Sequence, residues 1–315
     1  MYSDDKAPLP IASLLPKSFN MKQETISIQL SLVWSKVPLI IRAILSGFLV
    51  SSVGITLWSI FLMRFAAPWS ILPMIIVLFV YWKFFSGKLG SKKSTALKQS
   101  NFRAIHLERH VWKWGLVGAI FFVIIIQSSF VITFRIFEFP SVKFTADYKM
   151  LDTMPLWVAW AILIMSSIVA GICEETGFRG YMQVPLENKY GLVIAIVVSS
   201  LIFTAIHLTK TWAVPILPHI FFASVLLGIL AYKSGSLIPG IIGHSILDIF
   251  DYSIWWSNIT GGFHKQTIFK TGTDLHFIVW SLIFILALFV FFRSMERLKK
   301  EEPSKAKSVN VMELN

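Results

Sequence analysis

The sequence has few charged residues and a single cysteine. Only 15% of its 315 residues are Asp, Glu, Lys or Arg, whereas soluble domains carry about 25%. One cysteine excludes an intramolecular disulfide framework and any metal site built from several cysteines. The 17 glycines and 13 prolines are too few for a collagen-like or disordered chain. These shortages exclude an ordinary soluble globule and indicate an integral membrane protein.

Apolar residues are abundant: they make up 55% of the chain and give it a mean hydropathy of +0.69. They gather in eight runs, each near the roughly 17–25 residues that a helix needs to cross the hydrocarbon of a bilayer. The sequence therefore predicts an all-α, polytopic membrane helix bundle of about eight transmembrane helices. The runs are 37–65, 69–85, 114–134, 156–173, 191–206, 212–232, 237–257 and 275–292.

The net charge of +12 follows the predicted topology. With both termini in the cytoplasm, the inner segments hold 21 Lys and Arg residues and the outer loops hold 7. This bias is the positive-inside rule, and it explains the charge by orientation and contact with anionic membrane lipid, not by nucleic acid. Residues 1–36 show no signal peptide. We therefore expect a multi-pass protein of the plasma (cytoplasmic) membrane with both termini cytoplasmic.

A few ionisable residues fall inside or at the rim of the predicted spans, where they are costly and usually functional. Of the 17 acidic residues, only four lie there, and three of the seven histidines join them. All seven belong to the fourth to seventh spans. They are Glu174, Glu175, His207, His219, His244, Asp248 and Asp251.

The spacing of these residues places polar pairs on single helix faces. Residues four apart are neighbours on a helix, which applies to Glu175 and Arg179, to Phe203 and His207, and to His244 and Asp248. Residues 187–191 indicate a helix-hairpin turn. Glu174 and His207 both lie about 24–26 Å from this turn at 1.5 Å per residue, so they should be level. The spacing predicts one cavity just below the cytoplasmic surface.

Two carboxylates and two histidines in such a cavity can hydrolyse a peptide bond. Glu174, helped by His207, can activate a water molecule, and His244 can donate a hydrogen bond to the oxyanion. We expect Asp248, one turn away, to orient His244. Cys173 adjoins Glu174 in sequence, but neighbouring helical residues point about 100° apart, so no cysteine nucleophile is indicated.

At these residues the sequence resembles the membrane-embedded CPBP or Abi family, which includes type II CAAX prenyl proteases and bacteriocin-processing and immunity proteins. The family pattern is Glu-Glu-x-x-x-Arg, then Phe-x-x-x-His, then His-x-x-x-Asn or Asp. The matching residues, in the same order, are Glu174, Glu175, Arg179, Phe203, His207, His244 and Asp248. The match covers about 155–257, and each motif alone is weak, whereas the three in order are a strong signal.

The resemblance implies a glutamate-type intramembrane endopeptidase without a cofactor, with a cavity open to the cytosol. It implies that Glu174 and His207 activate the water and that His244 and Asp248 form the oxyanion site. The substrate it implies is a membrane-associated peptide or protein, possibly prenylated. Many members have Asn at the position of Asp248, and an ionised Asp cannot donate a hydrogen bond.

With this resemblance the chain divides into four regions. They are a polar cytoplasmic N-terminus (1–36), N-terminal transmembrane helices with a basic cytoplasmic loop (37–150), the family's catalytic core (151–257), and the last transmembrane helix with a charged cytoplasmic tail (258–315).

Several alternatives remain open. Glu174, His207 and His244 are also a known type of catalytic zinc set, two histidines and a carboxylate. A non-catalytic immunity or scaffold protein, or a permease, can use the same polar cavity for binding. The polar pairs can also be structural contacts between helices. We expect structural roles for Asp251 and for His219, which lies near prolines expected to kink the sixth span, and no metal site at His106 and His110.

Overall fold

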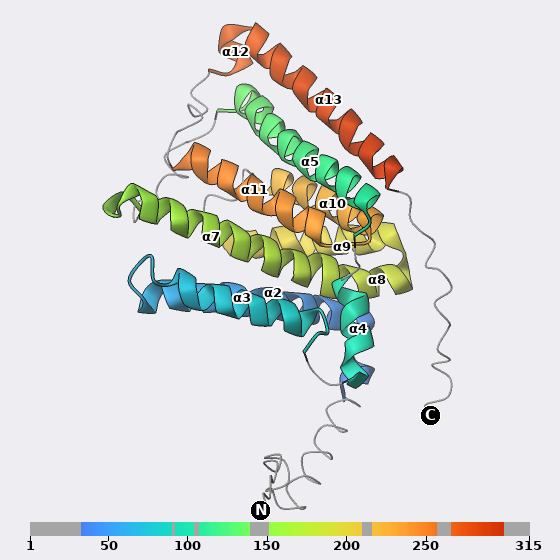
Figure 1. Cartoon of the computed structure of the whole chain (residues 1–315). Helices are drawn as coiled ribbons and strands as arrows, with labels where there is room; N and C mark the ends of the chain where they lie inside the picture. The colour runs from blue at the N-terminus through green and yellow to red at the C-terminus, as the bar shows by residue number, and fades with distance from the viewer. Residues whose placement is uncertain are drawn as a thin grey trace, which may run out of the picture. The chain divides into compact units, whose positions relative to one another are not determined.

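The computed structural model describes residues 33–89, 92–103, 107–138, 151–209, 216–256 and 266–298. Across these ranges every regular element is a helix (Figure 1). The chain forms two units, Met1–Arg42 and Ala43–Asn315. The described part of the first holds a helical turn at 33–36 and the start of α2. The second holds the rest of α2 and every other helix, and the site lies in it.

The helices and their bounds are α2 (Leu39–Arg64), α3 (Ile71–Phe85), α4 (Lys92–Phe102), α5 (Arg109–Ile136), α7 (Leu156–Glu174), η3 (Glu175–Met182), α8 (Gln183–Tyr190), α9 (Leu192–Ala205), η4 (Ile206–Thr209), α10 (Leu217–Ser234), α11 (Ile238–Trp255), α12 (Ile268–Thr271) and α13 (Leu275–Arg297).

Each of the eight predicted apolar runs coincides with a helix, which confirms an all-α polytopic membrane bundle. Within the described ranges five helices are long and apolar enough to cross a membrane: 39–64, 109–136, 156–190, 217–234 and 275–297. Ile71–Phe85 and Leu192–Leu208 are shorter apolar helices. α11 has 18 residues and is not one of the five, and it carries three ionisable groups, His244, Asp248 and Asp251.

Within the Ala43–Asn315 unit, α11 packs against both α7 and α5, and α13 packs on α5 (Figure 1). α10 packs against α9 and α5. One buried apolar cluster joins α5, α10 and α13, and a second joins α2, α3 and α7. The helix α11, which carries His244 and Asp248, therefore lies inside the bundle, between α7 and α5.

The expected kink in the sixth span is wrong for Pro218, while Pro215 lies outside the described residues. α10 begins only at Leu217, and Pro218 occupies its first turn. The missing N–H of proline costs nothing there, because the first N–H groups of a helix have no partner within it. Pro218 therefore starts this helix and does not bend it.

The fourth span is not a plain α-helix. α7 passes at Glu175 into the π-helix η3, which continues into α8 and ends at Gly191, whose φ is +84°. A π-helix bonds residues five apart and often marks a functional site. A carbonyl of η3, that of Phe178, accepts a hydrogen bond from the Ser199 hydroxyl at 3.2 Å. Gly177 lets α2 approach, because a Cβ there would lie 2.4 Å from the Gly47 carbonyl oxygen.

Some predictions fall beyond the described residues. They concern most of the polar N-terminal region, the tail after residue 298, and His106. The division into four regions stays a prediction.

Candidate active site

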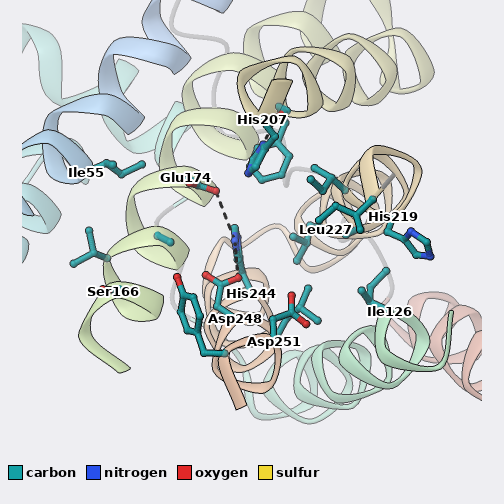
Figure 2. Close-up of a pocket in the computed structure, with 18 of the residues that line it drawn as sticks. Ile55, Ile126, Ser166, Glu174, His207, His219, Leu227, His244, Asp248 and Asp251 are labelled. Atoms are coloured by element: carbon teal, nitrogen blue, oxygen red, sulfur yellow. Dashed lines mark hydrogen bonds and ion pairs between the residues drawn. The ribbon is translucent and has the colours of Figure 1, made fainter. Parts of the chain in front are cut away.

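A cavity of about 320 Å³ lies among α5, α7, α10 and α11 (Figure 2). Apart from His219, its wall on α5 and α10 is apolar and includes Ile126, Phe130, Ile220 and Leu227. Glu174, His207, His244 and Asp248 all line it, so four of the six predicted site residues share one space, and Glu175 and Arg179 are not in its wall. The polar lining residues are Ser166, Glu174, His207, His219, His244, Asp248, Asp251 and Tyr252.

His244 lies at the centre of the polar cluster and is 6% exposed. Its Nδ1 is 2.8 Å from Oε1 of Glu175, and its Nε2 is 3.6 Å from Oε2 of Glu174. With Glu175 ionised, Nδ1–H donates to that carboxylate, so Nε2 is the nitrogen directed at the cavity. Figure 2 shows the ring of His244 between Glu174 and Asp248.

The expectation that Asp248 orients His244 differs from this geometry. Oδ1 of Asp248 lies 3.8 Å from Nε2 of His244, which is too long for a hydrogen bond. The orienting bond is the one from Nδ1 to Glu175. Asp248 instead places a second carboxylate near Nε2, in addition to that of Glu174, on the cavity side of the ring.

Glu175 and Arg179 form a buried pair behind the cavity. Both side chains are 0% exposed, and Nη1 of Arg179 is 3.1 Å from Oε1 of Glu175. Nη2 of Arg179 donates to the Ser224 hydroxyl at 3.0 Å, and the guanidinium lies over the Phe203 ring at 4.6 Å. The predicted contact across one helical turn is therefore present, and its carboxylate is the one that holds His244.

Close packing of α11 on this pair depends on a glycine. A Cβ at Gly240 would lie 3.2 Å from Oε2 of Glu175, closer than most real Cβ contacts. The same oxygen is buried and has no hydrogen-bond partner among the described residues. Gly240 thus gives Glu175 the clearance it needs to reach the ring of His244.

His207 lies in the 3-10 turn η4, at the end of α9. Its Nδ1 is 2.8 Å from the backbone oxygen of Phe203. A carbonyl only accepts, so Nδ1 carries the proton and, in the neutral ring, Nε2 is the basic nitrogen. Figure 2 shows His207 and Glu174 pointing into the same space from different helices, which agrees with the predicted equal depth.

The far part of the cavity holds a second polar group. Asp251 accepts a 2.7 Å hydrogen bond from Nε2 of Gln127 in α5. His219 stacks on Phe130 and lies 3.0 Å from the Thr133 hydroxyl. These contacts tie α11 and α10 to α5. Gln127 was not predicted, because only ionisable residues in the spans were considered. A search for amide side chains in the spans would have found it.

The predicted zinc ligands do not form a ligand cluster. Throughout the described ranges, no group of three or more His, Cys, Asp and Glu side chains is arranged to hold a metal ion. Nδ1 of His244 is engaged by Glu175 and Nδ1 of His207 by a backbone carbonyl, which leaves Nε2 of each ring as the nitrogen that could bind a metal. The zinc alternative therefore stays a prediction.

Comparisons with known proteins agree with the motif pattern. Residues 155–250 match the family model described as Type II CAAX prenyl endopeptidase Rce1-like. The chain is 23% identical over 180 residues to lysostaphin resistance protein A of Staphylococcus haemolyticus (strain JCSC1435). That alignment covers 55% of this chain and 49% of the relative, so the chain spans about half the length of the curated relative it matches. No solved structure matches the chain. The predicted family resemblance is confirmed.

Proposed function

We propose that this chain, whose residues 155–250 belong to the Rce1-like family of type II CAAX prenyl endopeptidases, is an intramembrane endopeptidase. In the proposed reaction a glutamate activates the attacking water molecule, and no metal ion takes part. One observation carries the proposal. Glu174, His207 and His244 line a single cavity inside the bundle, on three different helical segments. This arrangement supports the proposed roles of a carboxylate base, a second base and a hydrogen-bond donor around one space.

In the first step, a water molecule lies between Glu174 and Nε2 of His207. The Glu174 carboxylate takes a proton from this water, and the water oxygen bonds to the carbonyl carbon of the substrate. The electron pair of the carbonyl moves onto its oxygen. Nε2–H of a doubly protonated His244 donates a hydrogen bond to that oxyanion.

In the second step, the tetrahedral intermediate collapses. The oxyanion electrons re-form the carbonyl, the C–N bond breaks, and Glu174 returns its proton to the departing amine nitrogen. Glu175 and Arg179 hold the imidazole of His244 in place and do not touch the substrate. Asp248, 3.8 Å from Nε2, favours the doubly protonated ring that this step needs.

The test is cleavage of a quenched-peptide panel by the purified, full chain, with and without a farnesyl-cysteine. We expect Glu174→Gln and His207→Ala each to lower turnover by about 10²–10⁴-fold, since each removes a proton-transfer group. Glu296→Gln is the matched control, because Glu296 is exposed on α13 and pairs with Arg293, away from the cavity lining. Monodisperse elution of each variant shows that it is folded.

The outcomes separate the candidates. Turnover retained in Glu174→Gln contradicts this mechanism and favours a binding role, such as that of an immunity or scaffold protein. Activity that is lost on chelation and returns with stoichiometric zinc contradicts the metal-free form. The farnesylated and plain peptides show whether the substrate is prenylated. The charge distribution supports the plasma membrane with both termini cytoplasmic, where membrane lipid and a peptide or protein are the partners.

A further inference from the structure

The helix α4 and the end of α3 form a basic, amphipathic surface outside the active site. Between residues 83 and 107 the sequence has six Lys or Arg residues and no acidic residue. α4 contacts α3, η3 and α8, and Figure 1 shows it crossing the ends of these helices. We name the surface formed by Lys83, Phe84, Lys88, Leu89, Leu97 and Lys98 the α3–α4 surface.

One end of α4 is firmly anchored in the bundle. Phe102 is 1% exposed and packs edge-on against Trp82, in a cluster that also holds Leu237. Arg103 pairs with Glu187 of α8, and Gln183 donates to the same carboxylate at 2.7 Å. These contacts fix the position of α4 and use the charge of Arg103 within the protein.

The rest of the surface mixes apolar and cationic groups. Leu97 is 66% exposed, Phe84 44% and Leu89 43%. Nζ of Lys98 lies over the Phe84 ring at 3.3 Å from its centre, and Nζ of Lys83 lies over the Phe79 ring. Lysines that lie along apolar groups in this way keep their charge at the polar boundary of a membrane. In the described part of the chain, no carboxylate pairs with Lys83, Lys88 or Lys98.

From this arrangement we propose that the α3–α4 surface binds the head groups of anionic phospholipids. Exposed apolar side chains enter the acyl boundary, while the neighbouring lysines meet the phosphate of the head group. A zwitterionic lipid offers the same acyl chains without net negative charge, so the surface should discriminate between the two. The binding does not depend on the proposed protease activity.

The test places a polarity-sensitive fluorophore at Leu97, through Leu97→Cys in the full chain. Cys173 is fully buried, so the parent chain serves as the labelling blank. Short-chain phosphatidylglycerol or phosphatidylcholine is titrated into the detergent-solubilised protein. We expect a blue shift of the emission that half-saturates at least about tenfold lower in phosphatidylglycerol and weakens in high salt.

A charge-matched pair of variants tests the location. The variant with Gln at Lys83, Lys88 and Lys98 should lose the preference for phosphatidylglycerol. The control with Gln at Lys113, Lys189 and Lys233 removes the same charge elsewhere and should keep it. Each of the six substitutions removes one positive charge, and monodisperse elution confirms folding.

Three results would overturn the proposal. One is an equal response to the two lipids. Another is an equal loss of preference in both variants, which would mean that net charge alone attracts the lipid. The third is an equal shift with glycerol phosphate, which has the head-group phosphate but no acyl chain.

Discussion

Two buried arginines at different places in the bundle are satisfied in different ways. Arg135 in α5 is 2% exposed, and Arg179 in η3 is 0% exposed. Arg135 donates to both carboxylate oxygens of Asp274, and further to a set of partners around α12 and the start of α13. That set is the Gln266 backbone oxygen, the Thr271 hydroxyl and Nδ1 of His276.

Arg179 has fewer good partners than Arg135. Its Nη1 is within ion-pair distance of Glu175, but Nη1 and Nε have no well-aligned hydrogen bond among the described residues. A purely structural arginine is expected to satisfy its donors, as Arg135 does, because each buried unpaired donor costs about 1–3 kcal/mol. The incomplete pairing of Arg179 therefore lowers the stability of the bundle, and it occurs where Glu175 holds His244.

The largest effect is expected from breaking the buried pair at the site. Arg179→Met leaves the Glu175 carboxylate without its cation, at 0% exposure, and should lower the free energy of unfolding by about 3–5 kcal/mol. Turnover should also fall, because the carboxylate of Glu175, which accepts from His244, is no longer held by the guanidinium. Thermal unfolding in detergent measures the stability.

The double variant Arg179→Met, Glu175→Gln is the control for this prediction. It removes the stranded charge, so it should recover much of the stability but not the turnover. A double variant as unstable as the single one would show that packing around Arg179, and not charge, accounts for the loss.

A smaller effect is expected at the other arginine. Arg135→Met removes five hydrogen bonds, yet the side chain of Asp274 is 37% exposed and water can replace the lost donors. The free energy of unfolding should fall by about 2 kcal/mol, with turnover unchanged in the peptide assay. If the free energy of unfolding fell as much as in Arg179→Met, the two arginine sites would not differ in the way proposed.

The sequence predicted one of these arginines and missed the other, for a physical reason. Glu175 and Arg179 are four residues apart, so helical geometry alone brings them together. The partners of Arg135 lie more than 130 residues away, and its contact with Asp274 spans 139 residues. Arg135 follows the apolar run 114–134, so the sequence indicated only that it is a charged residue of an outer loop. Tertiary packing creates this cluster, and local spacing cannot predict it.

The same distinction applies to the fold and the cavity. Each of the eight apolar runs overlaps a helix, because bilayer length and apolar runs are local properties. The π-helix η3 and the hydrogen bond from His244 to Glu175 were not predicted. Both depend on neighbours from other helices: Ser199 bonds to the Phe178 carbonyl, and Gly240 gives Glu175 its clearance.

Acid should weaken the Arg135 cluster selectively. Hydrogen bonds from Arg135, and then from the Phe277 backbone N–H, lower the pKa of Asp274 to about 2. In the unfolded chain this pKa is about 3.9, so the stabilisation is present above that pH and is lost as the pH falls toward 2. The difference in melting temperature between the parent and Asp274→Asn should be constant from pH 7 to about pH 5 and shrink below it. A constant difference down to pH 3 would contradict this prediction.

The smallest effect should come from an exposed ion pair near the same cluster. Lys270 of α12 pairs with Glu138, and their side chains are 57% and 75% exposed. Water competes for both groups, so Lys270→Ala should change the melting temperature by less than about 1 °C. The next residue, Thr271, accepts a hydrogen bond from Arg135. Two contacts therefore hold α12, an exposed one through Lys270 and a buried one through Arg135. The melting temperatures of Lys270→Ala and Arg135→Met compare them. Equal decreases in melting temperature in the two variants would contradict this prediction. They would mean that the exposed Lys270–Glu138 pair stabilises α12 as much as the buried Arg135 does.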